Sequence, residues 1–247
     1  MKNLLQRILP KSVRSYFRKR FKIRPITISQ AGQDFWVYGE AFNEKENGYF
    51  VDIGAFDGIY HSNTYFLEYE YDWDGLCIEA NPLYFQDLIK NRDVICLNTC
   101  LDRSEEEVDF VQNTVMSGII DKGLDNSDIE QIDEEIITLK TYTLMNLLKE
   151  HDAPAIIDYL SIDVEGAEER ILSNFDFNAY KFKCITIERP SNKLRSILDQ
   201  CDYHLIKEIP GLDCFYVHND FLEQYKLNLF QFYNKRYYRL PQSRFLK

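Results

Sequence analysis

Short apolar runs alternate with helical stretches along most of the chain, and this alternation limits the possible fold more than any other feature. The runs lie at residues 49–53, 75–79, 94–97, 156–162 and 184–187. Continuous apolar runs of strand length are typical of parallel strands buried on both faces. A closing pair at residues 203–209 and 214–217 surrounds a Pro-Gly turn and predicts antiparallel pairing. The pattern predicts a Rossmann-like α/β fold, a mostly parallel, doubly wound sheet with an antiparallel edge strand.

The length of 247 residues suits one such domain with additions at both ends. We expect a basic amphipathic segment at residues 1–30, the domain at residues 31–220 and an aromatic, basic extension at residues 221–247. The first 24 residues carry nine basic and no acidic side chains, whereas residues 25–247 sum to −20. A body this acidic repels phosphate backbones, so nucleic acid is not an expected partner. The composition leaves the oligomeric state open.

Residues 2–21 place apolar side chains at roughly helical spacing, interrupted by Pro10. With its cations, residues 1–24 could make a peripheral contact with an anionic membrane surface, or dock on the acidic body of their own chain. No apolar run is long enough to span a membrane or to serve as a signal-peptide core. The six cysteines lack zinc spacing and mostly lie in the strand-like runs, which indicates reduced thiols. The sequence therefore predicts a soluble, cytoplasmic protein.

The loop after the first strand is rich in glycine and acidic residues. It contains Asp52, Gly54, Asp57 and Gly58, at the edge of the sheet where ligands of such folds bind. The glycines allow a tight turn and a close approach of the backbone to a ligand. The loop is not the G-x-G-x-x-G fingerprint of pyrophosphate binding. Two acids favour a phosphate-free ligand with a positive charge, such as S-adenosylmethionine, although an ordinary strand-to-helix turn is the alternative.

Glu79 closes the second strand, 21 residues beyond Gly58. A carboxylate at this position accepts hydrogen bonds from both ribose hydroxyls of an adenosine cofactor. Enzymes that use NAD share this feature, so Glu79 alone does not separate the two cofactors. Together with the glycine loop it favours the methyl donor.

Acidic residues also follow the fourth and fifth strands. If the fourth strand continues, Asp163 and Glu165 point the same way because side chains alternate along a strand, and Glu188 could join them. Carboxylates that share one cleft repel each other, which costs free energy unless they bind a cation, share a proton or act as a base. The alternative interpretation is that these residues are helix-capping acids. His61 follows the first loop and is a candidate general base for an acceptor hydroxyl, or a polar loop residue.

These segments resemble the FkbM family of methyltransferases over roughly residues 48–218. The matching blocks are FVDIGAFDG at residues 50–58, SNT at 62–64, GLCIEANP at 75–82, SGI at 117–119, DYLSIDVEGAE at 158–168 and ITIE at 185–188. The resemblance implies a class I methyltransferase fold and O-methylation, often of sugar or natural-product hydroxyls. It also implies cofactor roles for Asp52, Gly54 and Glu79.

Neighbouring residues complete the predicted cofactor site, namely Ala55, Asn63, Ala80 and Asp163. Many family-like sequences lack His61, so the resemblance adds nothing to its catalytic role. By a looser analogy with other sugar O-methyltransferases, Asp163, Glu165 and Glu188 are candidate ligands of Mg²⁺ beside the acceptor hydroxyls.

The sequence as a whole predicts an S-adenosylmethionine-dependent O-methyltransferase that acts on a sugar, glycan or other small-molecule hydroxyl. The candidate catalytic residues are Glu165, His61 and Asp163. Two other classes stay open: a nicotinamide-dependent oxidoreductase, and a non-catalytic, membrane-recruited scaffold that retains the fold.

Overall fold

A computed structural model describes residues 27–112, 117–121 and 135–237 of the chain. The amphipathic helix predicted at residues 2–21, with its membrane contact, lies outside these ranges. None of the helices in the described ranges is long and apolar enough to cross a membrane.

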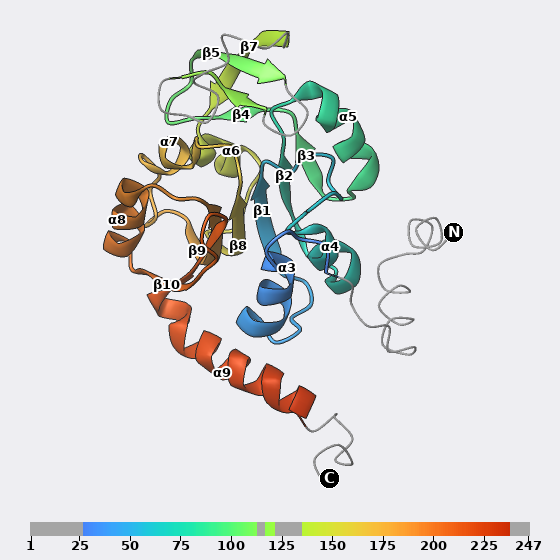
Figure 1. The fold of residues 1–247 in the computed structure, drawn as a ribbon, viewed down its shortest axis with the longest axis vertical. Coiled ribbons are helices and arrows are strands. Elements are labelled where there is room, and N and C mark those ends of the chain that lie inside the picture. Colours follow the sequence, from blue (N-terminus) through green and yellow to red (C-terminus); the bar gives the residue numbers. More distant parts are fainter. Residues whose placement is uncertain (1–26, 113–116, 122–134, 238–247) are drawn as a thin grey trace.

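A seven-stranded sheet forms the centre of the molecule, in the order β10-β11-β9-β8-β1-β2-β3 (Figure 1). Its strands are β1 (Tyr49–Ile53), β2 (Asp74–Ile78), β3 (Ile95–Leu97), β8 (Ile156–Ile162), β9 (Lys181–Glu188), β10 (Tyr203–Glu208) and β11 (Asp213–His218). Every pairing from β3 through to β9 is parallel. The apolar runs therefore form the mostly parallel α/β sheet that the sequence predicted.

The antiparallel strand lies one position in from the edge of the sheet, not at the edge as predicted. β11 pairs antiparallel with both β9 and β10. Every residue of β11 is buried, whereas β10 is mostly exposed. Because burial of the apolar run stabilises the inner position, β11 is inserted beside β9 and the more polar strand takes the edge.

Helices cover both faces of the central sheet. They are α3 (Gln33–Phe35), the π-helix η1 (Trp36–Ala41), α4 (Tyr65–Tyr71), α5 (Pro82–Asn91), α6 (Leu144–Glu150), α7 (Glu168–Leu172), α8 (Asn192–Gln200) and α9 (Asn219–Tyr237). Side chains of β1 alternate between two apolar clusters, with Val51 in the cluster shared with α6, α7 and α8, and Phe50 in the cluster shared with α4, α5 and α9. The caps are local: Asn81 accepts a hydrogen bond from the Leu83 N–H at the start of α5.

A second, four-stranded sheet lies at one end of the central sheet (Figure 1). It comprises β4 (Cys100–Leu101), β5 (Glu107–Gln112), β6 (Gly118–Ile119) and β7 (Glu135–Tyr142). None of these four strands corresponds to one of the apolar runs from which the central sheet was predicted. β7 pairs along the whole of β5, so tertiary pairing builds this sheet where the local pattern is weak.

The predicted C-terminal extension, residues 221–247, begins as the long helix α9. α9 packs against η1, where a hydrogen bond of 3.3 Å joins Trp36 Nε1 to the Tyr225 hydroxyl. Phe232 is completely buried in the same contact. α9 therefore extends the core that covers one face of the sheet.

Candidate active site

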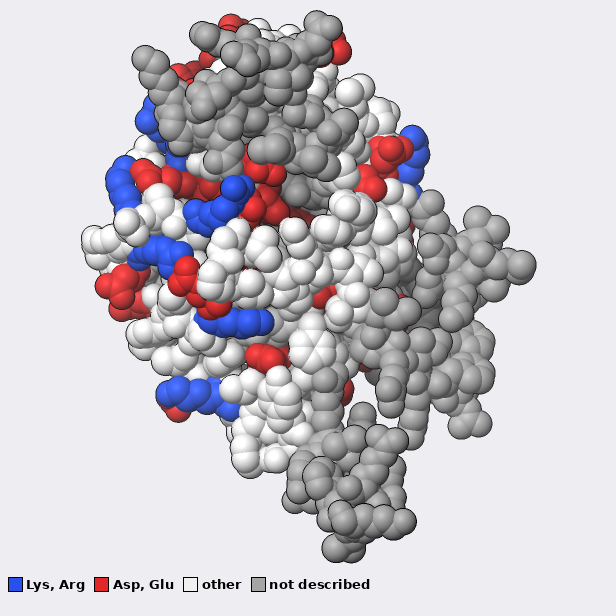
Figure 2. Space-filling view, in the orientation of Figure 1, with Lys and Arg blue, Asp and Glu red and all other residues white. Residues whose placement is uncertain are grey.

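A cavity of about 410 Å³ opens at the carboxyl ends of β1, β2 and β8, between the central and the small sheet. Acidic side chains gather around a recess in this part of the surface (Figure 2). The predicted site residues among its lining are Asp52, Gly54, Ala55, His61, Asn63, Glu79, Ala80, Asp163, Glu165 and Glu188. A volume of this order suits one small-molecule ligand.

Gly54 brings the loop after β1 into contact with the end of β8. Its φ of +83° lies in the left-handed region, and a Cβ at this position would be 1.8 Å from the backbone oxygen of Asp163. The N–H groups of Gly54 and Ala55 both donate to the Ile78 carbonyl of β2, at 3.0 Å each. Only glycine fits here, because both the conformation and the space exclude a side chain.

Glu79 is buried at the end of β2 and is held by two backbone N–H groups. Its Oε2 accepts from Phe56 at 2.8 Å, and its Oε1 accepts from Asn81 at 2.7 Å. Burial raises the pKa of Glu79 to about 7, although these two hydrogen bonds favour the ionised form. Each carboxylate oxygen keeps a second lone pair. Glu79 can therefore accept two further hydrogen bonds from a ligand in the cavity.

Asp52 belongs to a buried network that the sequence did not indicate. Thr64 Oγ1 donates to Asp52 Oδ2 at 2.6 Å, and the fully buried Arg92 lies 4.0 Å from the same oxygen. Arg92 also donates to Glu68 at 2.5 Å and to the Gly58 carbonyl at 3.3 Å. Burial raises the pKa of Asp52, and Arg92 opposes that shift. These contacts hold the loop after β1 in place where it lines the cavity.

Asp57 and Gly58, predicted as cofactor residues, are not among the residues that line the cavity. Asp57 Oδ1 accepts hydrogen bonds from the N–H groups of Ile59 and Tyr60, at 2.8 and 2.7 Å. Gly58 has a φ of +82°, and a Cβ there would lie 2.8 Å from Arg92 Cγ. Both residues shape the loop, and their contact with a cofactor stays a prediction.

Asn63 presents an unpaired oxygen to the cavity. Its Nδ2 donates to Ser161 Oγ on β8 at 2.9 Å, while its buried Oδ1 has no hydrogen-bond partner among the described residues. The buried Thr99 Oγ1 lines the same cavity and is likewise unpaired in the described part of the chain. Buried polar atoms are normally paired, so these two are suited to hydrogen bonds with a ligand.

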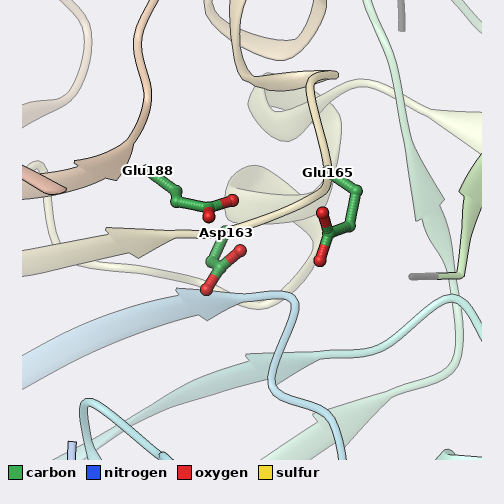
Figure 3. A group of neighbouring side chains, drawn as sticks. All are labelled: Asp163, Glu165 and Glu188. Atoms are coloured by element: carbon green, nitrogen blue, oxygen red, sulfur yellow. The ribbon is translucent and has the colours of Figure 1, made fainter. Parts of the chain in front are cut away.

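Three carboxylates meet at the ends of β8 and β9. Asp163 and Glu188 point toward one another, and Glu165 lies across from them (Figure 3). One ligand oxygen from each lies within 4.8 Å of the others. The predicted alternation along β8 does not produce this arrangement, because β8 ends at Ile162 and a turn with φ +53° at Glu165 follows it.

Arg189 balances this acidic cluster, and the sequence prediction did not include it. Its Nη2 donates to Glu165 at 3.2 Å and to Glu188 at 2.9 Å. Burial and the neighbouring Glu188 carboxylate raise the pKa of Asp163 well above its usual range. Asp163 therefore binds a proton more readily than an exposed carboxyl does.

The same geometry bears on the predicted Mg²⁺ site. A guanidinium already donates to two of the three candidate ligands, and Asp163 and Glu188 point toward one another (Figure 3). The positive charge that a cation would supply is thus provided by the protein itself. In this arrangement the cluster fits Mg²⁺ poorly, since the ion requires free carboxylate oxygens in near-octahedral geometry.

His61 lies at the exposed rim of the cavity. Its ring stacks on Tyr60, with 4.0 Å between ring centroids and an angle of 9°. Its backbone has a φ of +52°. No hydrogen bond within the described residues orients the imidazole, whereas a general base is normally held in place by one.

A model of the methyltransferase FkbM domain matches residues 52–205, which span the glycine loop, Glu79 and the acidic cluster. The chain belongs to this family of methyltransferases. No curated protein matches the sequence significantly.

Three solved structures are similar to parts of the chain at low sequence identity. Precorrin-6y C5,15-methyltransferase from Geobacter metallireducens GS-15 is 12% identical with a TM-score of 0.38, over 78% of this chain and 90% of that chain. A fibrillarin/Nop5p complex is 11% identical with a TM-score of 0.36, over 70% and 73%. The human methyltransferase 10 domain containing protein is 10% identical with a TM-score of 0.40, over 83% and 92%.

Proposed function

We propose that the chain is an S-adenosylmethionine-dependent O-methyltransferase that acts on a sugar or glycan hydroxyl. The observation that carries the proposal is Glu79, a buried carboxylate with both oxygens held by backbone N–H groups at the wall of the cavity. Among the described residues that line the cavity there is no Lys or Arg. A cavity with this charge suits a cationic, phosphate-free adenosine cofactor better than a dinucleotide.

The residues present fit such a cofactor. Gly54 lets the backbone come close to it, Glu79 would accept the ribose hydroxyls, and Asn63 Oδ1 would accept from an ammonium group. When bound, the cofactor supplies an electrophilic methyl group on a positively charged sulfur. The side chains around it hold and orient the two reactants.

The acidic cluster would accept the proton that an acceptor hydroxyl releases as its oxygen takes the methyl group. Burial and the nearby Glu188 carboxylate raise the pKa of Asp163 well above its usual range, which suits Asp163 to take up this proton. Arg189 donates hydrogen bonds to both Glu165 and Glu188. We therefore assign the proton to Asp163, and place Glu165, Glu188 and His61 as contacts to the acceptor.

Calorimetric titration of S-adenosylmethionine and S-adenosylhomocysteine tests the proposal. We expect micromolar binding, on the order of −8 kcal/mol. Glu79→Ala should weaken it at least ~10-fold through loss of two hydrogen bonds, while Glu223→Gln, an exposed acid on α9, should leave it unchanged. If neither ligand gives a heat of binding or raises the thermal stability of the protein, the proposal is wrong.

Mg²⁺ is best tested in the same titration. Because Arg189 already contacts Glu165 and Glu188, we expect the ion to leave cofactor affinity unchanged. A metal-dependent gain would instead show that the carboxylates release Arg189 and bind the ion.

Mixing the protein with NADH tests the nicotinamide-dependent alternative. NADH fluorescence should stay unchanged, since the glycine loop lacks the pyrophosphate fingerprint.

The proposal includes a cytoplasmic location. All six cysteines are free, and four of them are buried in the core. Free thiols suit a reducing compartment, where disulfides rarely persist. Fractionation of cells that express the tagged protein tests this part.

A further inference from the structure

A row of aromatic side chains forms one wall of the cavity and continues to its rim. The ring centroids of Tyr84 and Phe56 are 4.1 Å apart, those of Phe56 and Tyr60 are 6.2 Å apart, and those of Tyr60 and His61 are 4.0 Å apart. All four residues line the cavity. We refer to these four residues as the aromatic wall.

The outer end of the aromatic wall is exposed and yet fixed in place. Tyr60 is 58% exposed, although an aromatic ring of this size is usually more buried. Asp57 Oδ1 accepts the Tyr60 N–H at 2.7 Å, and Glu79 accepts the Phe56 N–H at 2.8 Å. These hydrogen bonds hold the main chain that carries Tyr60, and the rings of Tyr60 and His61 stack on one another at the exposed rim.

The order of the strands divides the cavity into two ends. Glu79 follows β2, Gly54 follows β1, Asp163 follows β8 and Glu188 ends β9, and these four strands are consecutive neighbours in the sheet. A cofactor held by Glu79 and Gly54 occupies the end over β2 and β1. A cavity of about 410 Å³ holds about one molecule of that size, so the acceptor is left with the β8–β9 end and the rim.

The loop that carries Tyr60 and His61 reaches this second end. Asn63, two residues after His61, is hydrogen-bonded to Ser161 on β8 at 2.9 Å. The Asn63 side chain is buried and belongs to the cavity lining. The loop therefore runs from Glu79, which accepts the Phe56 N–H, to β8, and the two exposed rings lie on it between these two contacts.

We propose that Tyr60 and His61 form the stacking platform for the ring of a sugar acceptor, and that the acidic cluster accepts hydrogen bonds from its hydroxyls. This inference rests on the proposed function. The negative face of an aromatic ring attracts the positively polarised C–H groups of a sugar, or a cation. The lining carries five carboxylates (Asp52, Glu79, Asp163, Glu165 and Glu188) and, in the described part of the chain, no Lys or Arg. The acceptor is therefore an uncharged sugar or an amino sugar, and not a phosphorylated or uronic one.

Saturation-transfer NMR on the protein loaded with S-adenosylhomocysteine tests this assignment without turnover. The probes are methyl glucoside, methyl glucosaminide and methyl glucuronide, which are neutral, cationic and anionic. We expect transfer to the ring protons of the first two sugars and weaker transfer to the glucuronide. Tyr60→Ala should reduce binding of the first two by about fivefold, the loss of one stacking contact.

Phe230→Ala is the matched control, since Phe230 is 66% exposed on α9, outside the cavity lining. It should leave sugar binding unchanged. Equal sugar binding by wild type and Tyr60→Ala, a preference for the glucuronide, or no binding of any probe would each overturn the platform while S-adenosylhomocysteine still binds. Failure of S-adenosylhomocysteine to bind would instead overturn the proposed function itself, and the platform with it.

Discussion

Replacement of Gly54 by Ala should destabilise the protein far more than the same replacement at Gly211. Both glycines have left-handed backbones, with φ of +83° and +77°. An alanine in that region costs about 1–2 kcal/mol at either position. At Gly211 a Cβ would meet nothing within 4 Å, whereas at Gly54 it would lie 1.8 Å from the Asp163 oxygen. The comparison therefore separates the conformational cost from the cost of the contact.

The contact cost follows from how far the backbone must move. Real Cβ contacts essentially never fall under 3.0 Å, so the segment at Asp163 or the loop must shift by more than 1 Å. The Asp163 N–H is bonded to the Ile53 carbonyl at 3.0 Å, and this hydrogen bond opposes the shift. Overpacking of this kind adds about 1–3 kcal/mol. We expect Gly54→Ala to cost about 2–5 kcal/mol in unfolding free energy, against about 1–2 kcal/mol for Gly211→Ala.

Urea unfolding measured by tryptophan fluorescence is a direct assay, because Trp36 and Trp73 are both buried and report on loss of the core. Thermal unfolding should show the same difference, because for a domain of this size each kcal/mol of lost stability lowers the Tm by roughly 2–4 °C. Folded Gly54→Ala should also lose S-adenosylhomocysteine affinity, while Gly211→Ala should retain it. Equal stability of the two variants would refute the steric argument.

Three further predictions concern charge. Burial raises the pKa of Glu79 to about 7, and ribose hydroxyls favour its ionised form, so cofactor affinity should rise with pH through 7 and level off above it. Calorimetry near pH 7 should show that cofactor binding releases a proton, and Glu79→Gln should abolish this release. Arg92→Met should cost about 3–5 kcal/mol by leaving the buried Glu68 carboxylate without its cation, and the double variant Arg92→Met/Glu68→Leu should recover part of it in denaturant unfolding, since Asp52 also loses Arg92. Deletion of residues 1–24 should abolish flotation with anionic liposomes if that segment binds membrane, and equal flotation of the full chain and the deletion would contradict it.

The central sheet could be predicted because its information is local. The apolar runs that form β1, β2 and β8 are continuous and buried on both faces, whereas the run at the sheet edge, β3, is not buried. The Asn81-Pro82 pair marks the start of α5 through a cap that involves only its own first turn. The positions of Glu79 and Asp163 follow from the same rule, since residues that end parallel strands meet at one edge of the sheet. β7 could not be predicted in this way, because most of its side chains are exposed or half-buried and β5 supplies its pairing.

The missed parts of the site depend on partners that are distant in the sequence. Nothing near Arg92 indicates that it is buried, since its partner Glu68 is 24 residues away and Asp52 is farther still. Arg189 follows Glu188 directly, but its role requires Glu165 to be brought alongside by the turn after β8. Asp57 shows the opposite case, because its side chain accepts hydrogen bonds from the next loop amides, a local contact, and the residue lies outside the cavity lining.

The two ends of the cavity differ in how readily they can change over evolution. The end that we propose to hold the methyl donor is defined largely by backbone, through Gly54, the Ile78 carbonyl and the amides that hold Glu79, so single substitutions there alter the loop itself. The rim is defined by exposed side chains such as Tyr60, which single substitutions can replace without moving the main chain. New acceptors can therefore be acquired one rim residue at a time while the donor is retained, and the same positions are the ones to randomise in an engineered enzyme.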